Sequence, residues 1–177
     1  MPSESLTVSD VLRRQVRSRG EHPLLVCDSE RLSYAEADRR SAHLARGLLA
    51  LGAGKGTHVG ILYPNGIAWV VAMLAAARIG AVVIPFSTFA TAPEIAVQLT
   101  DSDTEILLAA ASFRSHDYRE RLADIKAPLL RHVLIDAEPA DTADAWRLEA
   151  MEHDVDESDP LAIVYTSGST STPAGWW

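Results

Sequence analysis

The segment spanning residues 57–85 constrains the fold of this chain more than any other. Residues 67–79 are almost entirely apolar, and Gly80 follows them directly. A helix without a polar face is buried on all sides. An apolar strand pattern at 57–63 precedes it, and a continuous apolar run at 81–85, typical of a parallel strand covered on both faces, follows it. The segment therefore predicts a buried strand–helix–strand unit.

Strand and helix patterns alternate along most of the remaining chain. Helices are predicted at residues 8–18, 34–51, 92–100 and 113–125, and strands at 24–28, 31–33, 104–110, 131–135 and 161–166. Two helix starts carry capping boxes, Ser33 with Glu36 and Thr91 with Glu94, and Gly52 is placed to end the second helix. Alternation with short connections predicts an α/β fold, a layered parallel or mixed sheet with flanking helices.

Composition excludes several classes of protein. The chain has 177 residues, 47% of them apolar and 23% charged, which suits one globular domain. Its net charge is −8 and it has no run of Lys or Arg, so we expect no nucleic acid partner. No apolar stretch reaches the roughly 18 residues that a membrane span needs, and the N-terminus lacks a secretion signal, so we expect a cytoplasmic protein.

Neither cysteine nor histidine suggests a reactive or metal-binding site. Cys27 is the only cysteine, so no intrachain disulfide can form, and its apolar surroundings favour a buried packing role over a nucleophile. No two of the six histidines have the spacing of metal ligands, and we expect no metal site. The histidines are His22, His43, His58, His116, His132 and His153.

Residues 137–160 differ in composition from the rest of the chain. They are acidic and rich in alanine, and they contain no clear strand pattern. We expect a solvated linker there, with a short helix near Trp146. This linker separates the alternating region from the last strand and the segment after it.

Residues 165–175 are the most informative for function. They follow an apolar strand and combine Gly168 with a run of hydroxyl side chains that includes Thr166, Ser167, Ser169, Thr170 and Ser171. Hydroxyls and unhindered backbone N–H groups are the donors that a phosphate requires. A flexible Ser/Thr linker has the same composition, so composition alone leaves both interpretations open.

Other glycine-containing motifs are excluded by their spacing. Gly168 and Gly175 are too far apart for a Walker A loop, and no Lys-Ser/Thr pair follows Gly175. The chain has no G-x-S-x-G nucleophile elbow. The glycines of residues 52–57 precede a strand instead of joining a strand to a helix, so they do not form a dinucleotide fingerprint.

Residues 165–175, Y-T-S-G-S-T-S-T-P-A-G, resemble the signature Y-T-S-G-[ST]-T-x-x-P-K-G of the AMP-binding, adenylate-forming superfamily. Upstream segments agree in order and spacing. Residues 32–36 are similar to the L-[ST]-Y-x-E opening of that family, and 54–61 are similar to its G-x-G-D-x-V-x-I strand entry. Pro64-Asn65, Trp69 and residues 80–85 also match.

The resemblance implies an ATP-dependent acid–CoA ligase, which adenylates a carboxylic acid and then forms a thioester. It implies ATP with Mg²⁺, a carboxylic acid and CoA as partners, with a carrier protein as the alternative thiol. Residues 1–177 would form an incomplete N-terminal AMP-binding domain, with the linker at 137–160 and the phosphate loop at 165–175. The phosphate-loop residues would be Thr166, Ser167, Gly168, Ser169, Thr170 and Gly175. No catalytic residue of the family falls within the chain.

Two departures from the family pattern affect function. Ala174 occupies the position of the usual lysine, and the chain ends at Trp177, before the regions that complete the family's site. We therefore expect the chain alone to be inactive and to bind ATP weakly. The alternative is a non-catalytic truncated homologue that binds a partner or persists as a remnant. Apolar surface left uncovered would favour self-association.

The last residues suggest one origin for both departures. Losing one C from CCC-CGC-GGG-GTG-GTG, with G as the next base, changes Pro-Arg-Gly-Val-Val to Pro-Ala-Gly-Trp-Trp, the sequence of residues 173–177. A frameshift is thus one hypothesis, beside a natural truncation and a deliberately shortened chain. The gene sequence past codon 177 tests it, because the other frame must then resume an adenylate-forming sequence.

Overall fold

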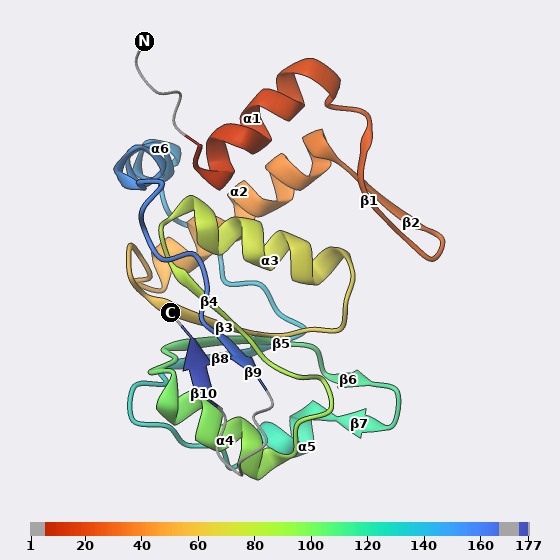
Figure 1. Ribbon diagram of the computed structural model, residues 1–177, viewed down its shortest axis with the longest axis vertical. Helices are drawn as coiled ribbons and strands as arrows, with labels where there is room; N and C mark the ends of the chain where they lie inside the picture. The colour runs from red at the N-terminus through yellow and green to blue at the C-terminus, as the bar shows by residue number, and fades with distance from the viewer. Residues whose placement is uncertain (1–5, 167–173, 177) are drawn as a thin grey trace.

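A four-stranded parallel sheet forms the centre of the protein, whose computed structural model describes residues 6–166 and 174–176 (Figure 1). Its strands are β3 (His58–Leu62), β4 (Val82–Pro85), β5 (Ile106–Ala109) and β8 (His132–Ile135). They lie in the order β4-β3-β5-β8, and every neighbouring pair is parallel. The predicted α/β fold with a parallel sheet is confirmed.

Helices cover both faces of this sheet (Figure 1). On one side lie α1 (Val8–Arg19), α2 (Tyr34–Ala50) and α3 (Ile67–Arg78), and on the other lie α4 (Ala92–Asp101) and α5 (Tyr118–Leu122). Side chains alternate along each strand, so Ile106 and Leu108 join one hydrophobic cluster and Leu107 joins the other. No helix within residues 6–166 and 174–176 has the length and apolar character needed to cross a membrane.

Helix α3 has the burial that its sequence predicts. Residues along most of its length are buried, and it lies against α2 and the sheet. Its last residue, Arg78, is only 4% exposed although it is charged.

The two short strands predicted near the N-terminus form a hairpin. β1 (Pro23–Cys27) pairs antiparallel with β2 (Glu30–Ser33), and the pair projects from the helical layer (Figure 1). Cys27, expected to be buried, is only partly buried, because it lies at the far end of this projecting strand.

The predicted helix boundaries agree with the caps. Glu94 accepts hydrogen bonds from the Thr91 N–H at 2.7 Å and from its hydroxyl at 2.8 Å, at the start of α4. Only half of the other capping box forms. The Ser33 hydroxyl accepts from the Glu36 N–H, but the Glu36 carboxylate binds Arg39 at 2.7 and 2.9 Å.

The predicted helix at 113–125 is wrong in its first part. Instead, β6 (Ser112–Phe113) and β7 (His116–Asp117) form a small hairpin, and α5 begins only at Tyr118. Asp117 caps α5 by accepting from the Glu120 N–H. Tyr118 is fully buried, and its hydroxyl donates to the Thr88 carbonyl at 2.7 Å. This tertiary contact places the helix start at Tyr118, which periodicity alone does not reveal.

The acidic residues 137–160 contain α6 (Ala145–Asp154), the helix predicted near Trp146. Trp146 is exposed, but Leu148 on the same helix is buried in the core beside α2 and α3. At Gly47 of α2, an added Cβ would lie 2.6 Å from the Pro139 carbonyl oxygen. Backbone and side chains of the acidic segment therefore lie directly on the helical layer.

Replacing Gly47 with alanine tests this packing, because the packing determines whether the free energy of unfolding rises or falls. In an uncovered helix, Gly→Ala stabilises by about 0.5–1 kcal/mol. We expect Gly47→Ala to lower the free energy of unfolding instead, by about 1–2 kcal/mol, because the methyl group displaces the Pro139 backbone. Urea denaturation measures it. A stabilised variant would contradict the packing of residues 137–160 against α2.

The Arg46–Asp141 pair makes the same contact sensitive to acid. Arg46 Nε donates to Asp141 at 2.7 Å, and this hydrogen bond is the main reason that the pKa of Asp141 is lowered from 3.8. A lowered folded-state pKa stabilises the protein above the unfolded value, and this contribution is lost as pH falls through the folded value. We expect Asp141→Asn to lower the melting temperature at pH 7, with the difference from the parent shrinking below about pH 4. A difference that is constant with pH would contradict this.

Candidate nucleotide-binding site

The segment just before β9 (Val164–Thr166) bonds to β4, the edge strand of the parallel sheet. The Val83 N–H donates to the Leu161 carbonyl and the Ile163 N–H donates to the Val83 carbonyl, both at 2.9 Å. Ala162 thereby pairs in parallel with Val83 of β4. The chain then continues as β9, so Thr166 lies toward the carboxyl ends of the parallel strands. Open α/β sheets bind their ligands at that edge.

A hairpin brings the two ends of the predicted phosphate loop together. β9 pairs antiparallel with β10 (Ala174–Trp176), Thr166 opposite Ala174 and Tyr165 opposite Gly175. Thr166 and Gly175 are the two predicted phosphate-loop residues that lie on these strands. The other predicted residues, Ser167, Gly168, Ser169 and Thr170, lie outside the described residues.

Tyr165 anchors the hairpin to the domain. Its ring packs against the hydrophobic cluster beneath the sheet. Burial raises the pKa of its hydroxyl, and Asp101 and Asp103 raise the pKa further, while a hydrogen bond with Ser102 opposes them. The sequence motif contains this tyrosine but does not reveal its packing role. These contacts place the hairpin beside the end of α4.

The charge near the hairpin only partly suits a triphosphate. The sequence supplies hydroxyl and backbone donors at 166–171, but residues 164–176 contain no Lys or Arg. Asp101 and Asp103 lie close enough to Tyr165 to raise its pKa, so the local potential is negative. Within residues 6–166 and 174–176, no group of three His, Cys, Asp or Glu side chains could hold a metal ion.

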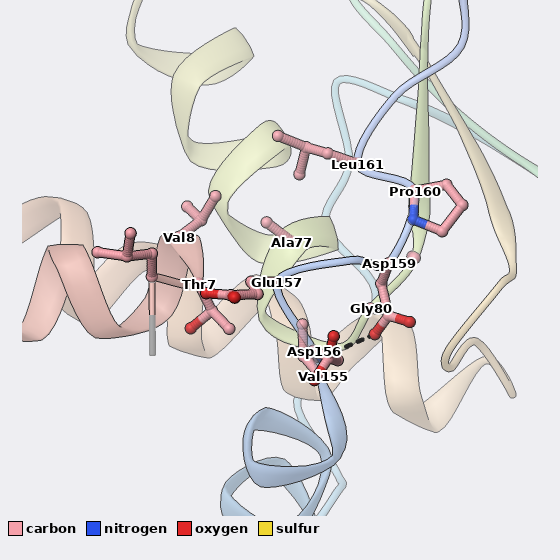
Figure 2. Close-up of a pocket in the computed structure, with 12 residues that line it drawn as sticks. Thr7, Val8, Ala77, Gly80, Val155, Asp156, Glu157, Asp159, Pro160 and Leu161 are labelled. Carbon is pink, nitrogen blue, oxygen red and sulfur yellow. Dashed lines mark hydrogen bonds between the residues drawn. The ribbon is translucent and has the colours of Figure 1, made fainter. Parts of the chain in front are cut away.

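Two hollows elsewhere do not offer phosphate a better place. A cavity of about 140 Å³ lies between α1, α3 and residues 155–161 (Figure 2), but Asp156, Glu157 and Asp159 line it. A surface hollow is lined by Arg39, Arg40 and His43 together with the carboxylate of Glu138. There Arg39 already binds Glu36, and His43 lies 2.9 Å from Asp141.

Comparison with known proteins agrees with this geometry. The model of the family described as AMP-binding enzyme matches residues 12–176. Over 99% of its length the chain is 36% identical to novobiocin biosynthesis protein H of Streptomyces niveus. It is 35% identical over 81% of its length to feruloyl-CoA synthase of an Amycolatopsis species, and 30% identical over 82% to long-chain-fatty-acid–CoA ligase FadD13 of Mycobacterium tuberculosis. It covers 29%, 27% and 29% of these proteins, less than a third of their length.

Solved structures show the same fold. The anthranilate CoA ligase AuaEII superimposes with a TM-score of 0.78 at 18% identity, over 97% of this chain and 34% of the ligase chain. The N-terminal domain of FACL13 from Mycobacterium tuberculosis superimposes with a TM-score of 0.73 at 26% identity, over 96% of this chain and 43% of that domain. The chain therefore belongs to the AMP-binding enzyme family, and its fold matches part of the N-terminal domain of adenylate-forming ligases.

Proposed function

We propose that this chain forms the N-terminal part of an ATP-dependent acid–CoA ligase, which adenylates a carboxylic acid and passes the acyl group to CoA. The observation that carries the proposal is the β9–β10 hairpin. It joins Thr166 to Ala174 at the carboxyl edge of the parallel sheet, at the two ends of the hydroxyl-rich signature. Two of the similar proteins are named as a CoA synthase and a CoA ligase, which favours CoA as the acceptor. ATP and CoA are supplied in the cytoplasm, so we propose that location for the protein.

In this proposal the chain's own residues bind and orient phosphate. Bound ATP would supply the α-phosphate that a carboxylate attacks, with pyrophosphate as the leaving group. The hydroxyls of Thr166, Ser167, Ser169 and Thr170, with the backbone N–H groups around Gly168, donate to phosphate oxygens. Gly175 pairs with Tyr165 and closes the hairpin behind them. Mg²⁺ would reach this chain through the nucleotide, since Mg²⁺ binds largely through substrate phosphates and water.

We further propose that the 177-residue chain alone does not catalyse adenylation. It covers less than a third of its relatives, and Ala174 leaves the loop without a cation while Asp101 and Asp103 lie nearby. In an acid-dependent pyrophosphate-exchange assay we expect no exchange above background with a panel of aromatic and fatty acids. A full-length feruloyl-CoA synthase with ferulate is the positive control. Clear exchange by the 177-residue chain would overturn the proposal.

A non-catalytic role is the second candidate, favoured by the alanine in the cation position. Such a chain would not bind ATP in a titration with MgATP.

Exposed apolar side chains near the hairpin, Leu161 at 45% and Val164 at 52%, favour self-association whether or not the chain binds ATP. We expect light scattering to give a mass that rises with protein concentration. A monodisperse monomer would contradict self-association.

A further inference from the structure

Helix α6 is fixed to the helical layer by a buried ion cluster. The Glu152 side chain is 7% exposed and accepts from Arg78 with one carboxylate oxygen and from Arg13 with the other. Arg78, whose side chain is 5% exposed, also binds the Asp38 carboxylate and donates to the Ser41 hydroxyl at 2.9 Å. Glu152 thus links α6 to α1 and α3, and Arg78 extends the link to α2.

A second contact holds the chain just after α6. Lys55 donates to the Asp154 carbonyl at 2.7 Å and forms an ion pair with Asp159 at 2.8 Å. Asp159 also accepts from the Asp156 N–H at 2.8 Å, which keeps this stretch in a tight turn (Figure 2). Val155 lies against Gly80 at the end of α3, where an added Cβ would be 3.2 Å from its side chain.

Only a short segment connects these contacts to the candidate site. The turn at 156–159 is followed at once by Leu161 and Ile163, which bond to Val83 of β4, and then by β9. We propose that Glu152 is a positioning residue for the β9–β10 hairpin and acts through α6 and the turn. Lys55, which contacts Asp154 and Asp159, fixes the same turn. The relevance of Glu152 to nucleotide binding rests on the proposed function, whereas its effect on the hairpin does not.

The chemistry of the cluster favours positioning over general stabilisation. Apolar side chains of similar volume usually serve stability as well as a buried ion pair does, and the best-attested use of buried polar groups is to fix register. Here the carboxylate of one helix is held by arginines of two others, which defines where α6 ends. Residues 155–163 connect that end to β9.

Hydrogen exchange at single amides tests the proposal in the full 177-residue chain. In Glu152→Gln we expect exchange of the Ile163 and Val83 amides to accelerate at least about tenfold more than exchange of the β5 amides that bond to β3, which follows the global loss of stability. Lys55→Gln, a change at a partly exposed side chain, should accelerate the same two amides. Glu149→Gln is the matched control, because Glu149 is exposed on the same helix and forms no ion pair among the described residues.

Two results would overturn the proposal. One is unchanged exchange at Ile163 in Glu152→Gln. The other is equal acceleration at Ile163 and throughout β5, which would mean a purely global loss of stability. ATP titration of the same variants tests the proposed function separately from the role of Glu152 in the hairpin. We expect Glu152→Gln to bind ATP about tenfold more weakly than the parent chain, and Glu149→Gln to bind it as the parent does. If the parent chain does not bind ATP, the proposed function fails, and the exchange comparison still decides the role of Glu152.

Discussion

Arg78→Ala is expected to lower the free energy of unfolding by about 3–5 kcal/mol, the effect of removing one partner from a buried ion pair. The guanidinium is almost inaccessible and contacts Glu152, Asp38 and Ser41. Its removal leaves the Glu152 carboxylate, 7% exposed, with Arg13 as its one remaining cation within residues 6–166 and 174–176. It also leaves a cavity at the end of α3. Urea denaturation followed by far-UV circular dichroism measures the change.

Arg39→Ala is the matched control on α2. Arg39 also forms an ion pair with a glutamate, but its side chain is 71% exposed. We expect no measurable change in stability for this variant, as is usual for exposed pairs. If Arg78→Ala were as mild as Arg39→Ala, the buried cluster would not hold the four helices together.

Ala174→Lys is expected to tighten ATP binding by about 10- to 150-fold, which corresponds to the roughly 1.5–3 kcal/mol of a charge-assisted hydrogen bond. Ala174 lies opposite Thr166 in the hairpin, at the position where the family signature has lysine. A lysine there also offsets the negative charge of Asp101 and Asp103. Calorimetric or fluorescence titration with MgATP measures the change.

Ala174→Gln separates charge from size. Glutamine adds a long side chain and donors without a positive charge, so we expect it to recover only a small part of the gain. The gain with lysine should also shrink at high salt, since ions screen the added attraction. Equal affinity of the two variants, or a lysine effect that is insensitive to salt, would contradict a phosphate site beside Ala174.

The central sheet was predictable because its signals are local. The apolar helix ending before Gly80, the apolar strand after it and the Thr91–Glu94 capping box each depend on a few neighbouring residues, and each is confirmed. The family followed from the signature at 165–175, which the family comparison bears out. Assignment of individual phosphate-loop residues remains a prediction.

The features that were missed depend on contacts between distant segments. The small hairpin before α5 exists because Tyr118 packs beneath the sheet and reaches Thr88. Glu152 looked like one charge in an acidic segment, yet Arg13 and Arg78 bury it. Charge composition predicts a solvated face, and only the fold reveals which carboxylates meet buried arginines.

The most direct test of the central claim is a titration of the isotopically labelled 177-residue chain with MgATP, followed by backbone amide NMR. We expect saturable shift changes confined to amides of β9, β10 and the 167–173 segment between them, with the same changes at lower ATP concentration in Ala174→Lys. Absence of shifts in both proteins, or shifts centred on α6 or the β1–β2 hairpin, would contradict a nucleotide phosphate site at residues 165–175.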